Sequence, residues 1–131
     1  MLDLQHVLLV EDDPDIAVLV TIALTEISGF RVDHCDSAEA AIEWFETHKN
    51  PDLLLLDYLL PGLTGEELLF RLRSNPKTAS IPVIFMTASV MPKHVSQLRS
   101  LGALEVLHKP FDPLVLGNQI EAIFRAAGGQ A

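Results

Sequence analysis

The segment "PDLLLLDYLLPG", residues 51–62, places four consecutive leucines directly before Asp57. A run this apolar predicts a strand that is buried on both faces of a parallel sheet. A carboxylate at the end of such a strand needs a partner or water to support its charge. Asp57 is therefore the first candidate for a functional residue.

Around this strand, short apolar runs alternate with longer amphipathic stretches. The runs that end at Val10, Asp57 and Thr87 are the most apolar, so we expect them to form the central strands. Five strands alternating with five helices predict an α/β fold, with a doubly wound parallel sheet and right-handed crossovers. The five strand candidates are residues 6–10, 30–35, 53–57, 82–87 and 104–108.

The helix starts carry recognisable signals. An N-cap residue is followed either by proline at once or by glutamate three residues later, as in a capping box. Gly29 and Gly102 stand where helices should end. The fourth helix, at about 92–101, is the weakest, with Val95 and Leu98 as its apolar anchors. The expected N-caps are Asp13, Asp36, Thr64 and Asp112.

Composition limits the possible functions. The 131 residues suit one domain, and no apolar stretch approaches the length of a membrane helix. No signal peptide is apparent, and a single cysteine, Cys35, fits a reducing compartment, so we expect a cytoplasmic protein. The net charge of −9 disfavours direct nucleic-acid binding.

Chemically active side chains follow several of the predicted strands. In a doubly wound sheet the carboxyl ends of the strands meet at one edge, where ligands bind. Close carboxylates raise one another's pKa values, and a divalent cation relieves that conflict. An all-oxygen set favours Mg²⁺, and the combination with a lysine and a hydroxyl suits phosphoryl transfer. The residues at the strand ends are Glu11, Asp12, Asp13, Asp57, Thr87, Ser89 and Lys109.

Each of these features has an ordinary explanation when it is taken alone. An acidic trio after a strand often only complements the dipole of the following helix. A Lys-Pro pair is usually a surface turn, and threonine is common at strand ends. These explanations do not account well for Asp57, because a carboxylate that directly follows four leucines is costly without a function.

Four segments together resemble the receiver domain of two-component response regulators: "VLLVEDDPDI", "PDLLLLDYLLPGLTGEEL", "IPVIFMTA" and "GALEVLHKPFDP". The resemblance runs from about His6 to Phe124. It implies a flavodoxin-like sheet with strand order 2-1-3-4-5. It also implies a receiver domain over residues 1–125, with 126–131 as a tail or linker. Such a domain is a signalling switch that catalyses its own phosphorylation and slow dephosphorylation.

The resemblance further implies a role for each matching residue. Asp57 would accept a phosphoryl group from a phosphohistidine on a histidine kinase or a histidine phosphotransfer protein. Mg²⁺ would be bound by Asp12, Asp57 and the backbone carbonyl of Leu59, and by Glu11 mostly through water. Lys109 would pair with a phosphoryl oxygen.

The signal would leave the site through Thr87, which would move towards the phosphoryl group. The face of the fourth helix, fifth strand and fifth helix would then control a downstream protein or a fused output domain. Pro110 is expected to follow a cis peptide bond. Val106 departs from the family pattern, because many receivers carry an aromatic switch residue there.

Two other classes of protein remain as alternatives, an enzyme and a flavin-binding protein. A Mg²⁺-dependent phosphatase with an aspartate nucleophile would need a second aspartate two residues later, where this chain has Leu59. A flavodoxin would need a phosphate-binding loop in place of "EDDP", residues 11–14. A receiver that serves only as an interaction module would have lost a site residue, and none is lost.

Overall fold

The computed structural model describes residues 4–88 and 92–128, without the side chains of residues 92 and 94. The strands are β1 (His6–Val10), β2 (Arg31–Cys35), β3 (Leu53–Asp57), β4 (Val83–Thr87) and β5 (Glu105–His108). The helices are α1 (Pro14–Ile22), the π-helix η1 (Ala23–Ile27), α2 (Ala38–Thr47), α3 (Gly65–Arg73), α4 (Pro92–Ser100) and α5 (Leu116–Ala126).

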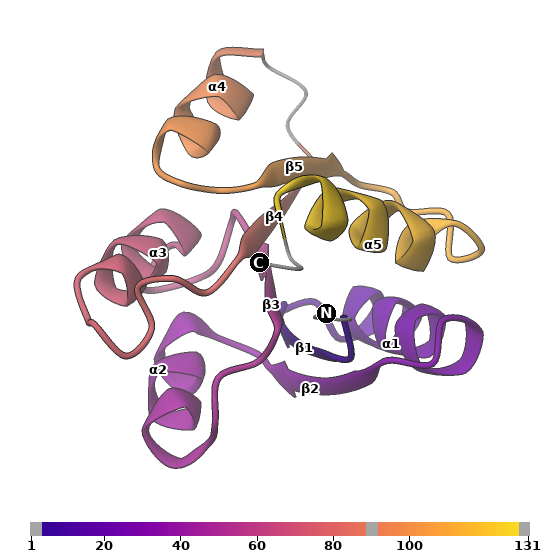
Figure 1. Cartoon of the computed structure of the whole chain (residues 1–131), viewed down its shortest axis with the longest axis horizontal. Coiled ribbons are helices and arrows are strands. Elements are labelled where there is room, and N and C mark those ends of the chain that lie inside the picture. The colour runs from indigo at the N-terminus through magenta and orange to yellow at the C-terminus, as the bar shows by residue number, and fades with distance from the viewer. Residues whose placement is uncertain (1–3, 89–91, 129–131) are drawn as a thin grey trace.

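The five strands form one parallel sheet in the order β2-β1-β3-β4-β5 (Figure 1). This order is the flavodoxin-like order that the resemblance implied. Every residue of β1, β3 and β4 is buried, which confirms that the three most apolar runs are central. The edge strand β2 is less buried: Arg31 and His34 are exposed, and only Cys35 is buried.

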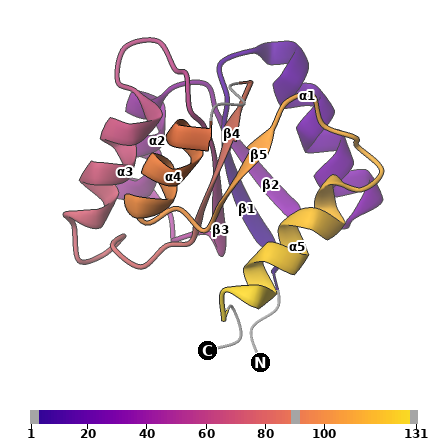
Figure 2. The ribbon, with the colours of Figure 1, turned by 90° about the horizontal axis from the view of Figure 1, so that it is seen from above.

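Helices cover both faces of the sheet, which therefore has an apolar core on each side. Helices α2, α3 and α4 lie on one face, and α1 and α5 lie on the other (Figure 2). Among the described residues, no helix is long and apolar enough to cross a membrane.

Two of the predicted helix starts are confirmed. The Asp13 carboxylate accepts hydrogen bonds from the backbone N–H groups of Asp15 and Ile16, at 2.9 and 3.3 Å, and caps α1. Thr64 and Glu67 form the expected capping box of α3. These caps depend only on residues that are adjacent in the sequence.

The predicted cap of α2 at Asp36 is wrong. Ser37 is the N-cap, and its hydroxyl accepts a hydrogen bond from the N–H of Ala40 at 3.0 Å. The Glu39 carboxylate does not close a capping box. It accepts instead from the N–H of Leu63 at 3.2 Å, in the loop after β3. A contact that is distant in the sequence therefore replaces the local one.

The predicted start of the last helix at Asp112 is also wrong. The Asp112 carboxylate accepts a hydrogen bond from the N–H of Leu114 at 3.0 Å and closes a turn. Helix α5 begins only at Leu116, whose side chain is fully buried. The helix starts where its apolar face first meets the core. The π-helix at the end of α1 was not predicted either.

Candidate functional site

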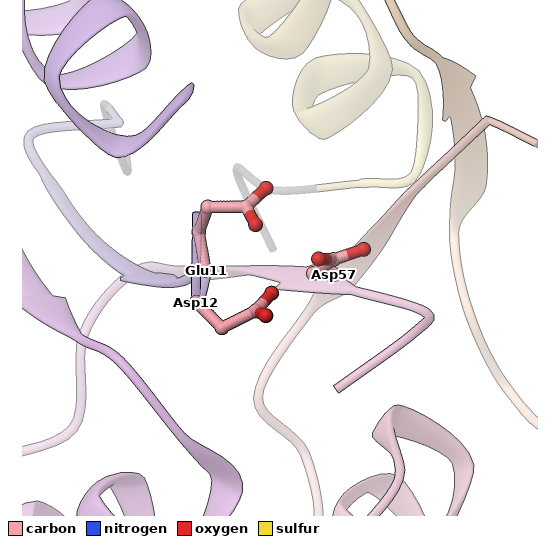
Figure 3. A group of neighbouring side chains, drawn as sticks. All are labelled: Glu11, Asp12 and Asp57. Atoms are coloured by element: carbon pink, nitrogen blue, oxygen red, sulfur yellow. The ribbon is translucent and has the colours of Figure 1, made fainter. Parts of the chain in front are cut away.

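Three carboxylates meet at the carboxyl ends of the two central strands β1 and β3. Glu11 and Asp12 directly follow β1, and Asp57 is the last residue of β3. One carboxylate oxygen from each lies within 4.8 Å of the other two (Figure 3). Glu11 and Asp57 are buried, whereas Asp12 is exposed. The predicted convergence of these residues is thus present.

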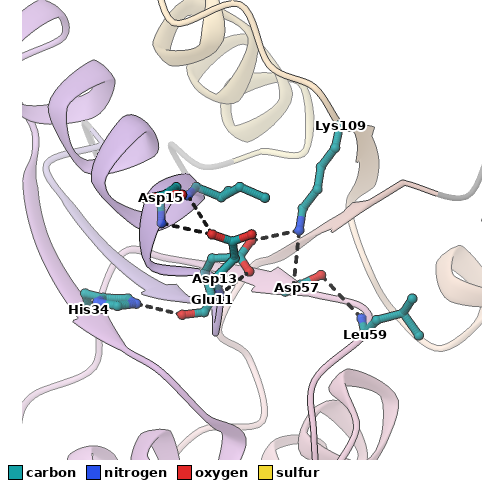
Figure 4. Close-up of polar contacts among 8 residues, drawn as sticks. Glu11, Asp13, Asp15, His34, Asp57, Leu59 and Lys109 are labelled. Atoms are coloured by element: carbon teal, nitrogen blue, oxygen red, sulfur yellow. Dashed lines mark hydrogen bonds and ion pairs between the residues drawn. The ribbon is translucent and has the colours of Figure 1, made fainter.

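The ammonium group of Lys109 lies between the two buried carboxylates. Its Nζ is 2.8 Å from Glu11 Oε1 and 3.3 Å from Asp57 Oδ2 (Figure 4). Lys109 directly follows β5, and its backbone N–H donates to the carbonyl of Thr87 at 2.8 Å. The peptide bond between Lys109 and Pro110 is cis, as expected.

Glu11 is the most deeply buried of the acidic side chains at this site. Its Oε2 accepts a hydrogen bond from the backbone N–H of Asp13 at 3.1 Å. Among the buried side-chain atoms that the structure describes, Glu11 Oε1 alone lacks a hydrogen bond. The nearby Lys109 compensates this oxygen as an ion pair. One ammonium therefore serves two carboxylates.

The crowding changes the protonation of the buried groups. Burial first, and then the adjacent carboxylate of Glu11, raise the pKa of Asp57 to about 7, although Lys109 opposes the shift. Burial would also raise the pKa of Glu11, but the contacts of its side chain with Lys109 and Asp57 hold that pKa below its usual value. Burial would lower the pKa of Lys109, and the two carboxylates raise it instead. Asp57 is therefore the group that keeps its proton below about pH 7.

These residues fit a divalent cation that prefers oxygen ligands. Three carboxylates converge, the buried oxygen Glu11 Oε1 is balanced only by its ion pair with Lys109, and burial together with the nearby Glu11 carboxylate opposes the ionisation of Asp57. Leu59 lies beside the cluster, since its N–H donates to Asp57 Oδ1 at 3.3 Å while its side chain is 69% exposed. The use of the Leu59 carbonyl as a ligand stays a prediction.

The remaining predicted residues lie on β4 and β5 or just beyond them. Thr87 is buried at the end of β4, one residue beyond Met86, which pairs with Asp57 in the sheet. Val106 is buried on β5, in the core that faces α4. Ser89 lies outside the described residues.

Sequence reasoning missed one contact at the site. The His34 ring donates from Nε2 to the backbone carbonyl of Glu11 at 2.8 Å (Figure 4). His34 lies near the end of the edge strand β2, so it reaches the same edge of the sheet as the carboxylates. Its position at a strand end was the available signal, but the interaction depends on the parallel pairing of β1 with β2.

Comparisons with known proteins agree with this geometry. The sequence pattern of the response regulator receiver domain matches residues 7–121. The phosphate regulon transcriptional regulatory protein PhoB of Pseudomonas aeruginosa is 34% identical over 122 residues, which are 93% of this chain and 52% of PhoB. The transcriptional regulatory protein CseB of Streptomyces coelicolor is 38% identical over 128 residues, which are 98% of this chain and 53% of CseB.

Solved structures show the same fold. A putative response regulator from Chloroflexus aurantiacus superposes with a TM-score of 0.84 at 30% identity, and the match covers 92% of this chain and 98% of that one. The fold and the acidic site define a signalling switch of two-component systems. The chain belongs to the response regulator receiver domain family. It spans about half the length of the regulators PhoB and CseB.

Proposed function

We propose that Asp57 accepts a phosphoryl group from a phosphohistidine on a histidine kinase or a histidine phosphotransfer protein. The observation that carries this proposal is the position of Lys109, whose ammonium lies 2.8 Å from Glu11 and 3.3 Å from Asp57. A cation at this place can pair with Asp57 at rest and with a phosphoryl oxygen after transfer. A positioned nucleophile with compensating charge is the main requirement of phosphoryl transfer.

In the transfer step, one carboxylate oxygen of Asp57 attacks the phosphorus atom. The phosphorus–nitrogen bond of the donor breaks, and the histidine nitrogen keeps the electron pair. The nucleophile must be ionised, and at rest burial and the Glu11 carboxylate oppose this ionisation. Lys109 favours the ionised form, and we propose that it then holds an oxygen of the transferred group.

Asp12, Asp57 and the carbonyl of Leu59 would hold Mg²⁺ directly, and Glu11 would act mostly through water. When bound, the ion would neutralise the carboxylates and the phosphoryl oxygens. Because Asp12 faces solvent, phosphate oxygens and water can complete the ligand set. An exposed Asp12 beside two buried carboxylates supports this assignment.

The donor would dock on the face formed by α1 and the segment after β5. Large apolar side chains are exposed there at Val18, Leu19, Ile22, Leu114 and Val115. Next to them is an almost wholly apolar hollow of about 360 Å³, lined by Ile16, Leu19, Ala88, Lys109, Pro110 and Phe111. Because Lys109 belongs both to the hollow and to the acidic site, a partner that covers this face reaches Asp57.

This docking surface can be tested separately from the chemistry. We expect Ile22→Glu to retain labelling by a small phosphodonor but to lose about tenfold in the rate of transfer from a phosphorylated histidine phosphotransfer protein. Phe70→Glu on α3 is the matched control, because Phe70 is also exposed but lies on the other side of the sheet. Equal transfer rates in the two variants would contradict this docking site.

The signal would leave through Thr87 and the start of α4. Thr87 would move towards a phosphoryl oxygen, because its hydroxyl gains a hydrogen bond to a charged group. Val106 is small and buried, so the aromatic movement of other receivers is replaced by movement of the backbone at 88–92. Residues 89–91 of that segment lie outside the described residues. Hydrogen exchange with a phosphoryl mimic should change mainly at residues 87–98, and changes confined to 104–108 would contradict the proposal.

The output would pass to a downstream protein or to a fused output domain. The switching face would consist of α4, β5 and α5, where Lys93 and Gln97 are exposed on α4. With a net charge of −9, we propose that this chain does not bind nucleic acid directly. We propose that residues 1–125 form the receiver domain and that residues 126–131 are a tail or linker.

The decisive experiment is labelling with a small phosphodonor, followed by intact mass spectrometry. The wild type should gain one phosphoryl group at Asp57 when Mg²⁺ is present and none when it is chelated. Asp57→Asn should gain none, whereas the control Asp52→Asn, at the opposite end of β3, should be labelled normally. Full labelling of Asp57→Asn at this site would end the proposal.

A further inference from the structure

His34 is an exposed residue near the end of the edge strand β2. Its Nε2 lies 2.8 Å from the backbone carbonyl oxygen of Glu11 (Figure 4). A carbonyl oxygen only accepts hydrogen bonds, so Nε2 carries the hydrogen. The neutral ring with that tautomer and the protonated ring both supply this donor, and the contact therefore does not depend on the charge of the ring.

A second contact holds the same residue from the same strand. The N–H of Glu11 donates to the carbonyl of Cys35 at 3.0 Å, one residue beyond the pairing of β1 with β2. Both backbone polar groups of Glu11 are thus bound to consecutive residues of β2. Its side chain is held from elsewhere, by the N–H of Asp13 and by Lys109.

This arrangement fixes the point where β1 ends and the acidic turn begins. Strand β1 lies between β2, which carries His34, and β3, which carries Asp57. The carbonyl that His34 holds belongs to the peptide bond between Glu11 and Asp12. The orientation of that peptide sets where both side chains point relative to Asp57.

We propose that His34 is a positioning residue of the metal site, which holds the Glu11–Asp12 peptide so that the carboxylates converge with Asp57. This role rests on the proposed function, because it assumes that the three carboxylates bind Mg²⁺. Groups that orient the ligands of a metal site without touching the ion typically change its affinity by tenfold or more. His34 is exposed, so loss of its ring should leave the fold largely intact.

The test compares Mg²⁺ affinity, measured by calorimetry, in the wild type and in three variants. His34→Ala and His34→Phe remove the donor, and we expect the Mg²⁺ dissociation constant to rise about tenfold. His34→Gln keeps an N–H donor at a similar reach, and its affinity should stay within about threefold of the wild type. Urea unfolding without Mg²⁺ should differ little among the three variants.

His48→Ala is the matched control, since this exposed histidine lies just beyond the end of α2, where its ring stacks on Trp44. It should bind Mg²⁺ like the wild type. Unchanged affinity in His34→Ala and His34→Phe, or no recovery in His34→Gln, would overturn the positioning role. Failure of the wild type to be labelled at Asp57 with Mg²⁺ would overturn the proposed function itself, whereas normal labelling with equal affinities would overturn only the role of His34.

Discussion

The two ends of the central strands differ in how completely their charged and polar groups are paired. At the amino end, Asp52 Oδ2 accepts hydrogen bonds from the N–H groups of Gln5 and His6, at 3.0 and 2.9 Å. The His6 ring lies between Arg31, 3.0 Å from Nδ1, and Asp33, 2.7 Å from Nε2. Each of these charged or polar groups has a complementary partner, which is what structural contacts require.

The carboxyl end lacks this balance. Three carboxylates converge, but the ammonium group of Lys109 pairs with only two of them, Glu11 and Asp57, and the pKa of Asp57 is raised to about 7. The amino end is therefore organised for stability, whereas the carboxyl end keeps an excess of negative charge that a divalent cation can neutralise. Substitutions of the same kind at the two ends should then have different effects.

The largest difference should come from removing a cation at each end. Without Mg²⁺ at pH 8, Lys109→Ala leaves two buried carboxylates uncompensated and should lower the free energy of unfolding by about 3 kcal/mol. The loss should shrink at pH 5, where Asp57 holds a proton. Arg31→Ala is the control, because it removes a single part-buried hydrogen bond to His6, and this loss should cost about 1 kcal/mol. Urea unfolding measures the stability of both variants. Equal losses at pH 8 would contradict the difference in charge balance between the two ends.

Replacing a carboxylate by an amide should have opposite signs at the two ends. The pKa of Asp57 is higher in the folded protein than in the unfolded chain, so the folded state binds more protons between about pH 4 and pH 7. Wild-type stability without Mg²⁺ should therefore fall as the pH rises through this window. Asp57→Asn removes the effect and should be more stable than the wild type at pH 8, by about 2 kcal/mol.

At the other end, Asp52→Asn should be less stable than the wild type by about 1 kcal/mol, because two charge-assisted hydrogen bonds become neutral. Urea unfolding of both variants at pH 5 and pH 8 gives the comparison. If Asp57→Asn were destabilised at pH 8 without Mg²⁺, the crowding of charge at the carboxyl end would be refuted.

Mg²⁺ should stabilise the protein through the acidic end alone. At ten times its dissociation constant, a ligand that binds only the folded state adds about 1.4 kcal/mol to the free energy of unfolding. Asp12→Ala should lose most of this gain. Asp33→Ala, at the amino end, should keep it although that variant is itself less stable. A full gain in Asp12→Ala would show that the ion binds elsewhere.

The sequence predicted the parts of the fold that depend on continuous local patterns. The central strands followed from uninterrupted apolar runs, and the caps at Asp13 and Thr64 followed from neighbouring residues. The predicted caps at Asp36 and Asp112 were wrong because the starts of α2 and α5 depend on contacts with residues that are distant in the sequence. Glu39 bonds the loop after β3, and α5 starts where Leu116 enters the core.

The same division applies to the site. The convergence of Glu11, Asp12 and Asp57 could be predicted, because parallel strands bring their carboxyl ends to one edge. The sequence could not predict that Lys109 lies nearer to Glu11 than to Asp57, since this difference depends on side-chain geometry within a few tenths of an ångström. The contact of His34 was missed because it requires the register between β1 and β2.

The smallest expected effect is that of Leu59 on the lifetime of the phosphorylated protein. Leu59 lies two residues after Asp57, and its N–H donates to the Asp57 carboxylate while its side chain is 69% exposed. A leucine at this position cannot hydrogen-bond the water that would attack the phosphoryl group, and it would shield that group from solvent. Leu59→Asn should therefore shorten the lifetime of the phosphorylated protein about threefold, or about 0.7 kcal/mol in activation free energy.

The lifetime is measured by removing the phosphodonor and following the loss of the phosphorylated mass with time. Phe70→Asn is the matched control, because it also replaces an exposed apolar side chain by an amide but lies on α3, away from the carboxylates. Phosphorylated Phe70→Asn should lose its phosphoryl group at the wild-type rate, since a polar substitution on α3 does not change the surroundings of the attacking water. An equal or longer lifetime in Leu59→Asn would mean that access of water to Asp57 is set by other residues around the strand ends.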